Sequence, residues 1–186
     1  WGWLCALGAV GLLVLLQLRP IAQGVALASV LLVAAYPFMK RITWWPQAWL
    51  GMVFTWGLLV GWTQLRADNL DALAAMYAGA ALWVIGYDTI YAMQDREDDA
   101  LVGIRSSALR MGTKVRGGVS FCYAAAVALW ALAFVAFIVW YTLIEILEIK
   151  AEGWAYFKEP WNYLDWLNLI ILYCVIGLKL STYLIL

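Results

Sequence analysis

The 186-residue sequence contains no histidine and only three cysteines, and 13% of its residues are charged. Without histidine, sites for zinc or haem and imidazole-based proton transfer lose their usual side chains. Cys5, Cys122 and Cys174 each stand alone in an apolar run, where a free cysteine packs as a small hydrophobic residue. Any metal bound by this chain would therefore have oxygen ligands, which Mg²⁺ and Ca²⁺ prefer.

The sequence also lacks net charge, because twelve basic and twelve acidic residues cancel. Nucleic-acid binding, which depends on an excess of positive charge, therefore has no electrostatic support. The hydrophobic share is 66% and the mean hydropathy is +0.83, far above the values of soluble domains. This composition predicts an all-α fold, a polytopic bundle of transmembrane helices in a lipid bilayer. Its 13 tryptophans suit membrane interfaces and helix packing.

Apolar segments separated by polar or proline-containing breaks predict about six membrane helices. The fifth segment is unusually long, because at 1.5 Å per residue it measures about 46 Å against a hydrocarbon core of about 30 Å. It is either one tilted or protruding helix or two segments run together. The six approximate ranges are 2–17, 21–38, 47–65, 70–93, 117–147 and 163–186.

The basic residues predict the orientation of these segments. The loops 39–46 and 94–116 are two spans apart, so they share a side, and together they hold seven of the twelve basic residues. The opposite loops hold only Arg19 and Arg66. The positive-inside rule places the acidic loop 94–116 on the cytoplasmic or matrix side. The chain opens directly in an apolar segment at Trp1, so we expect no signal peptide and a natural N-terminus upstream.

The stretch 87–105, YDTIYAMQDREDDALVGIR, holds five of the twelve acidic residues. Carboxylates are costly near a bilayer, so such a cluster is a candidate functional site. Asp88, Asp95 and Asp99 stand at i, i+7 and i+11, which on one continuous helix places them near one face, with Tyr91 between them. Mg²⁺ would relieve their repulsion, since it binds one or two carboxylates and keeps positions for phosphate oxygens.

Basic residues nearby extend this interpretation to a substrate. Lys40, Arg41 and Arg105 could hold a diphosphate from the same side of the membrane. A lipid diphosphate, with its head at the surface and its tail in the bilayer, fits such a site. The alternative is a solvated acidic helix end paired with local arginines.

Two long pieces of the chain resemble UbiA-type 4-hydroxybenzoate polyprenyltransferases: YPFMKRITWWPQAWLG (36–51) and YDTIYAMQDREDDALVGIRSSAL (87–109). The resemblance covers about 1–136. It implies a transferase of the bacterial or mitochondrial inner membrane that moves a polyprenyl group from its diphosphate to an aromatic acid in ubiquinone biosynthesis. It also implies magnesium ligands (Asp88, Asp95, Asp99), catalytic residues (Asp88, Tyr91, Asp95) and diphosphate-binding residues (Lys40, Arg41, Arg105).

One part of the family pattern is missing from these residues. The first Asp-rich motif, NDxxDxxxD, should precede segment 2–17, yet no Asp or Glu comes before Asp68. We therefore expect the chain by itself to be an incomplete, inactive prenyltransferase. The alternative is a non-catalytic structural subunit that packs with other membrane subunits.

The C-terminal region has a different character. Residues 141–178 resemble the second and third sensor-like helices of polycystin TRP-type channels, with Glu145, Glu148 and Asp165 at the acidic positions. The two resemblances imply opposite orientations of the predicted helix 117–147 in the membrane. We therefore predict a junction that separates 1–136 from 137–186, as a natural fusion, a chimera or a piecewise-assigned chain that includes a cation-channel fragment.

Overall fold

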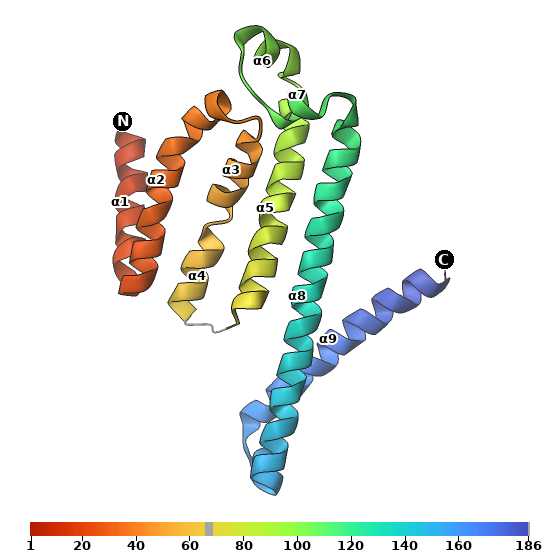
Figure 1. Ribbon diagram of the computed structural model, residues 1–186. Helices are drawn as coiled ribbons and strands as arrows, with labels where there is room; N and C mark the ends of the chain where they lie inside the picture. Colours follow the sequence, from red (N-terminus) through yellow and green to blue (C-terminus); the bar gives the residue numbers. More distant parts are fainter. Residues whose placement is uncertain (66–68, 186) are drawn as a thin grey trace. The chain divides into compact units, whose positions relative to one another are not determined.

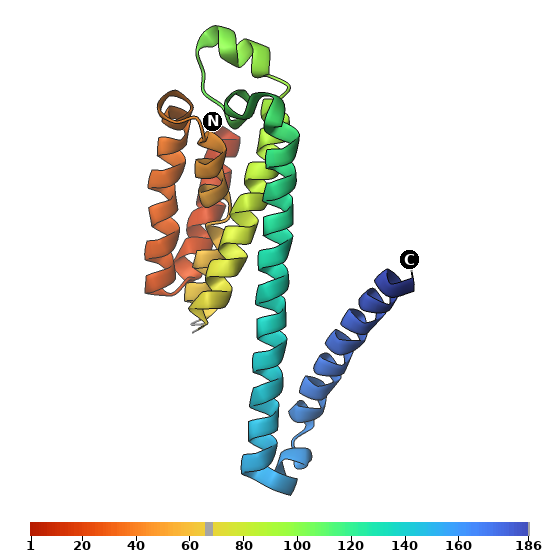
Figure 2. The ribbon, with the colours of Figure 1, turned by 45° about the vertical axis from the view of Figure 1, so that its right-hand side comes forward.

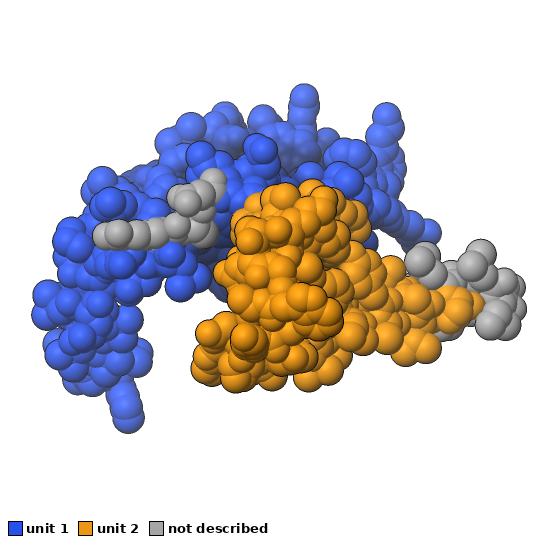
Figure 3. All heavy atoms as spheres, turned by 90° about the horizontal axis from the view of Figure 1, so that it is seen from below, with its two compact units in different colours: residues 1–133 blue, residues 134–186 orange. Residues whose placement is uncertain are grey.

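The computed structural model describes residues 1–65 and 69–185 (Figure 1). Arg66, one of the two basic residues of the opposite loops, and Asp68 lie outside this part. Every regular element among the described residues is helical, so the predicted all-α class is confirmed. The chain divides into two compact units, unit 1 (residues 1–133) and unit 2 (residues 134–186) (Figure 3).

Unit 1 contains seven α-helices and the start of an eighth within the described residues, and unit 2 contains the rest of α8 and α9. Two short 3₁₀ turns, η1 and η2, flank α8. The elements are α1 (Gly2–Gln17), α2 (Pro20–Ile42), α3 (Pro46–Phe54), α4 (Gly57–Leu65), α5 (Leu70–Ala92), α6 (Arg96–Val102), α7 (Ser107–Met111), η1 (Gly112–Lys114), α8 (Val115–Glu152), η2 (Gly153–Lys158) and α9 (Pro160–Ile185).

Local sequence signals explain where several helices begin and end. Pro20 and Pro46 occupy the first positions of α2 and α3, where a missing N–H costs nothing. The side chain of Asn69 caps α5 by accepting a hydrogen bond from the Ala72 N–H at 3.0 Å. Gly103 ends α6 with a φ of 76°, a left-handed conformation that favours glycine.

The structure differs from the predicted segments in three places. The segment 47–65 is two helices, because the chain turns at Thr55 between α3 and α4. The segment 21–38 is longer than predicted, since α2 continues past Pro37 to Ile42. For the segment 117–147 the structure has the first predicted alternative, one helix, but α8 extends beyond both predicted ends to 38 residues, about 57 Å at 1.5 Å per residue.

Four helical stretches in the described part of the chain are long and apolar enough to cross a membrane. They are Pro20–Ile42, Leu70–Ala92, Ser107–Lys158 and Pro160–Lys179. Two of the six predicted segments are shorter than a full span, because α1 has 16 residues and α3 and α4 have 9 each. The polytopic membrane fold agrees with the prediction, and within the described residues four stretches, compared with about six predicted segments, reach full-span length.

Unit 1 is a row of neighbouring helices in which α3 and α4 lie between α2 and α5 (Figures 1 and 2). Indole side chains connect the row: the Trp49 Nε1–H donates to the Leu32 carbonyl at 2.9 Å, and the Trp56 Nε1–H donates to the Val25 carbonyl at 2.7 Å. Inside a bilayer such bonds have little competition from water. These tryptophans therefore join neighbouring helices of unit 1.

Glycine allows the closest backbone contact in this row. A Cβ atom on Gly51 of α3 would lie 2.8 Å from the backbone oxygen of Ala81 in α5. Small residues permit such an approach between membrane helices, whose association depends on close van der Waals packing. The spacing of α3 and α5 therefore depends on Gly51.

We predict that Gly51→Ala destabilises unit 1. The added methyl group meets a backbone atom that cannot move independently, and overpacking of this kind costs about 1–3 kcal/mol. The measurement is the thermal unfolding midpoint in detergent. Gly61→Ala is the matched control, because nothing lies within 4 Å of its added Cβ; its midpoint should be unchanged or higher, and an equal loss in both variants would contradict the prediction.

Candidate active site

The loops 39–46 and 94–116 meet at one end of unit 1 (Figure 1). The backbone N–H of Arg105 donates to the Lys40 carbonyl at 2.9 Å, and its Nη1 donates to the Ile42 carbonyl at 2.7 Å. Both acceptors belong to the last turn of α2, whose carbonyls have no partner within the helix. The prediction that the two loops share a side is therefore confirmed.

The guanidinium of Arg105 also lies over an aromatic ring. Its Cζ is 5.4 Å from the centre of the Trp44 ring, a cation–π distance. These two residues help to line an open pocket of about 320 Å³ between the loops. The other lining residues are Ala100, Gly103, Ile104 and Leu109.

Asp88 lies in the last turns of α5 and is half-buried. Its charge interacts with that of Lys40, at the end of α2. Tyr36 of α2 also lies close enough to interact with Asp88. The structure thus brings together a predicted metal ligand, Asp88, and a predicted diphosphate-binding residue, Lys40, from helices α5 and α2.

Asp95 and Asp99 lie on a separate element. The helix α5 ends at Ala92, the chain turns over residues 93–95, and α6 follows. Asp95 is exposed just before α6, and Asp99 is partly exposed within it. The expectation of one helical face that carries Asp88, Asp95 and Asp99 is therefore wrong, because the turn interrupts the helix on which that spacing argument depends.

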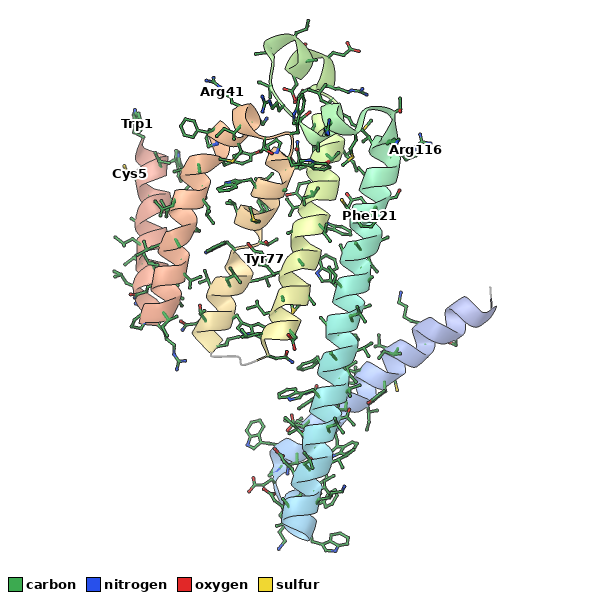
Figure 4. All side chains as sticks on the ribbon, viewed as in Figure 1. Trp1, Cys5, Arg41, Tyr77, Arg116 and Phe121 are labelled. Carbon is green, nitrogen blue, oxygen red and sulfur yellow. The ribbon has the colours of Figure 1, made fainter. Side chains whose placement is uncertain are left out.

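The other predicted site residues are accessible. Tyr91 is 62% exposed and stands edge-on to Tyr87, with ring centres 6.4 Å apart. Arg41 is exposed at the end of unit 1 that carries the acidic loop, where Arg116 also lies (Figure 4). This end of unit 1 therefore combines exposed positive charge with the exposed acidic residues of α6.

The donor chemistry of the aspartates fits Mg²⁺, but their placement does not form a complete metal cage. Within the described ranges, no three Asp, Glu or Cys side chains are grouped so that they could hold one ion. Mg²⁺ does not require such a group, because one or two carboxylates with phosphate and water oxygens complete its six positions. The residues thus suit a metal that arrives with a diphosphate better than a metal held by protein alone.

Sequence reasoning missed three buried polar residues at the base of this region. Gln47 is 2% exposed, and Thr89 and Ser107 are 0% exposed. The Ser107 N–H donates to Gln47 Oε1 at 3.1 Å, and the hydroxyls of Thr89 and Ser107 are 2.7 Å apart. For Gln47 and Thr89, the sequence signal that could have revealed them is a polar residue in a mainly apolar helical segment.

Proteins similar to this chain are named as polyprenyltransferases or a geranyltransferase of 4-hydroxybenzoate. The chain is 45% identical over 107 residues to the mitochondrial 4-hydroxybenzoate polyprenyltransferase of Arabidopsis thaliana, covering 57% of the chain and 26% of the relative. It is 38% identical over 148 residues to the protein of that name from Drosophila melanogaster, covering 79% and 33%. It is 42% identical over 120 residues to 4-hydroxybenzoate geranyltransferase 1 of Lithospermum erythrorhizon, covering 64% and 39%.

The chain spans about a quarter to two fifths of the length of these relatives. No solved structure matches it. The profile of the UbiA prenyltransferase family matches residues 1–148, which include unit 1, both meeting loops and the predicted site residues. The chain therefore belongs to the UbiA prenyltransferase family.

Proposed function

We propose that this chain forms part of a membrane enzyme that transfers a polyprenyl group from its diphosphate to an aromatic acid, 4-hydroxybenzoate, in ubiquinone biosynthesis. The observation that carries the proposal is the joining of the basic and acidic loops, in which Arg105 donates hydrogen bonds to the carbonyls of Lys40 and Ile42 at the end of α2. The names of the relatives support the choice of substrates.

In this proposal, the basic residues bind the leaving group. Lys40, Arg41 and Arg105 surround the diphosphate and stabilise the negative charge that develops as the carbon–oxygen bond to the prenyl group breaks. Arg105 can take part although it binds the end of α2, because a guanidinium has five N–H donors and Ile42 uses one of them. Arg41 is exposed and free of the burial that would restrict its approach to a ligand.

The acidic residues provide the metal ligands of the proposed site. Asp88, Asp95 and Asp99 are the candidates for Mg²⁺, with Asp88 and Asp95 also assigned to catalysis. When bound, Mg²⁺ would neutralise diphosphate charge and assist departure of the leaving group. The exposed ring of Tyr91 would face the allylic cation, which an aromatic face can stabilise. The apolar helices would keep water from that cation.

The proposed location follows from charge and from the relatives. The meeting loops carry most of the basic residues, which places them on the cytoplasmic or matrix side of an inner membrane. Relatives named as mitochondrial proteins support this choice. The bilayer, a polyprenyl diphosphate and an aromatic acid are then the partners of the site.

We propose that the chain supplies one of two Asp-rich elements. Its 186 residues contain no acidic residue before Asp68, so transfer would require a further Asp-rich segment, and the chain alone would bind diphosphate without turnover. We also propose that 137–186 is a separate region. The division into compact units near residue 134 supports this, although the family match continues to residue 148.

We predict that the purified chain in lipid nanodiscs binds geranyl diphosphate in a Mg²⁺-dependent manner. Asp88→Asn should weaken this binding at least about tenfold, since a tenfold change corresponds to about 1.4 kcal/mol. Asp71→Asn, on the first turn of the same helix, is the matched control and should bind as the original chain does. Isothermal titration with and without Mg²⁺ measures the effect, and binding that is indifferent to the metal would refute the proposal.

A second prediction separates specific diphosphate binding from general attraction by positive charge. Lys40→Met should weaken binding of geranyl diphosphate, because the charge of Lys40 is close enough to interact with that of Asp88. Lys114→Met removes the same charge from η1, at the far end of the acidic loop 94–116, and should have a much smaller effect. If titrations show equal losses for the two variants, the attraction is a property of the surface and Lys40 has no special role.

A further inference from the structure

The acidic loop returns to the helix from which it starts. The chain leaves α5 at Ala92, carries Asp95 and Asp99 through α6, and comes back at Ser107. The Ser107 hydroxyl lies 2.7 Å from that of Thr89 on α5. Since Thr89 directly follows Asp88 in the sequence, the loop is fastened beside the aspartate of α5.

A second bond fixes the same point to α3. The Ser107 N–H belongs to the first turn of α7, where helix N–H groups lack internal partners, and it donates to Gln47 Oε1. Gln47, Thr89 and Ser107 are all at least 98% buried, so these bonds are protected from exchange with water. They join α3, α5 and α7 at a single point, which we call the polar clasp.

The polar clasp differs from the packing around it. Apolar contacts would hold α7 against α5 without defining its position along the helix, whereas hydrogen bonds have preferred distances and angles. The clasp therefore defines where the loop returns relative to Asp88. Arg105, two residues earlier, is bound to the end of α2. The returning segment of the loop is therefore attached to α2 through Arg105 and to α3 and α5 through Ser107.

We infer that Gln47, Thr89 and Ser107 are positioning residues, which hold Asp95 and Asp99 in place relative to Asp88 and so set the Mg²⁺ affinity of the diphosphate site. This inference rests on the proposed function for its ligand. Groups hydrogen-bonded directly to metal ligands change metal affinity by about 10–100-fold when they are replaced. The three residues of the polar clasp act through the backbone of the loop, so we expect an effect at the lower end of this range.

The decisive variant removes both hydroxyls of the clasp, Thr89→Val with Ser107→Ala. A single replacement leaves a buried hydroxyl without its partner, which costs about 1–3 kcal/mol, whereas replacing both partners by apolar groups is nearly neutral. A merely structural pair would therefore regain both stability and Mg²⁺ affinity in the double variant. A positioning pair would regain stability but not Mg²⁺ affinity.

The binding experiment is a Mg²⁺ titration of geranyl diphosphate binding in nanodiscs, with thermal unfolding measured in parallel. The double variant should unfold near the original midpoint and need about tenfold more Mg²⁺ for half-saturation. Thr89→Ser in the original chain keeps both hydroxyls of the pair and should retain the original Mg²⁺ response. Thr55→Val removes a buried hydroxyl that bonds only within its own helix region and is the matched control. An unchanged Mg²⁺ response in the double variant would overturn the inference.

A second readout does not depend on diphosphate. Spin labels at Asp98→Cys and Ala74→Cys, with the three native cysteines replaced, report the distance between the acidic loop and α5. The distribution should be narrow in the original background and in Thr55→Val, and broad in the double variant. A narrow distribution in the double variant would refute the positioning role even if diphosphate binds. A different result is a distance distribution that broadens in the double variant while the original chain shows no Mg²⁺-dependent diphosphate binding. This result would refute the proposed function and still support the positioning role of the polar clasp.

Discussion

The arrangement of the candidate site depends on how the last carbonyls of α2 are satisfied. A membrane helix can leave its final carbonyls without partners only where water or another donor reaches them. Here the backbone and side chain of Arg105 donate to Lys40 and Ile42. Because Arg105 lies far along the chain from these acceptors, one set of hydrogen bonds both completes α2 and brings the acidic loop to the basic loop.

The same physical constraint connects the fold to the proposed chemistry. A low-dielectric bilayer makes isolated charges costly, so charged residues gather at the end of unit 1, where Lys40 and Asp88 interact. A diphosphate with Mg²⁺ supplies both signs of charge that such a site can accommodate. The apolar helices below it offer a suitable environment for a prenyl chain, whose transfer depends on the exclusion of water.

Sequence periodicity was sufficient for the helical class and for which loops share a side, because apolar runs and basic residues are local signals. It failed for the single helical face of Asp88, Asp95 and Asp99, since the turn at residues 93–95 contains neither proline nor glycine. It also missed the polar clasp, because Gln47, Thr89 and Ser107 are far apart in sequence and meet only through packing. The structure leaves the separate character of 137–186 as a proposal.

The central claim is that the end of α2 and the acidic loop form one diphosphate site. Its most direct test replaces Mg²⁺ with Mn²⁺ and records paramagnetic broadening of backbone amide NMR signals in the presence of geranyl diphosphate. The account predicts that signals of Asp88, the 94–105 loop and Lys40 broaden first, at low Mn²⁺ concentration. Broadening centred on Glu145 and Glu148 of unit 2, or spread evenly over the exposed carboxylates, would contradict it.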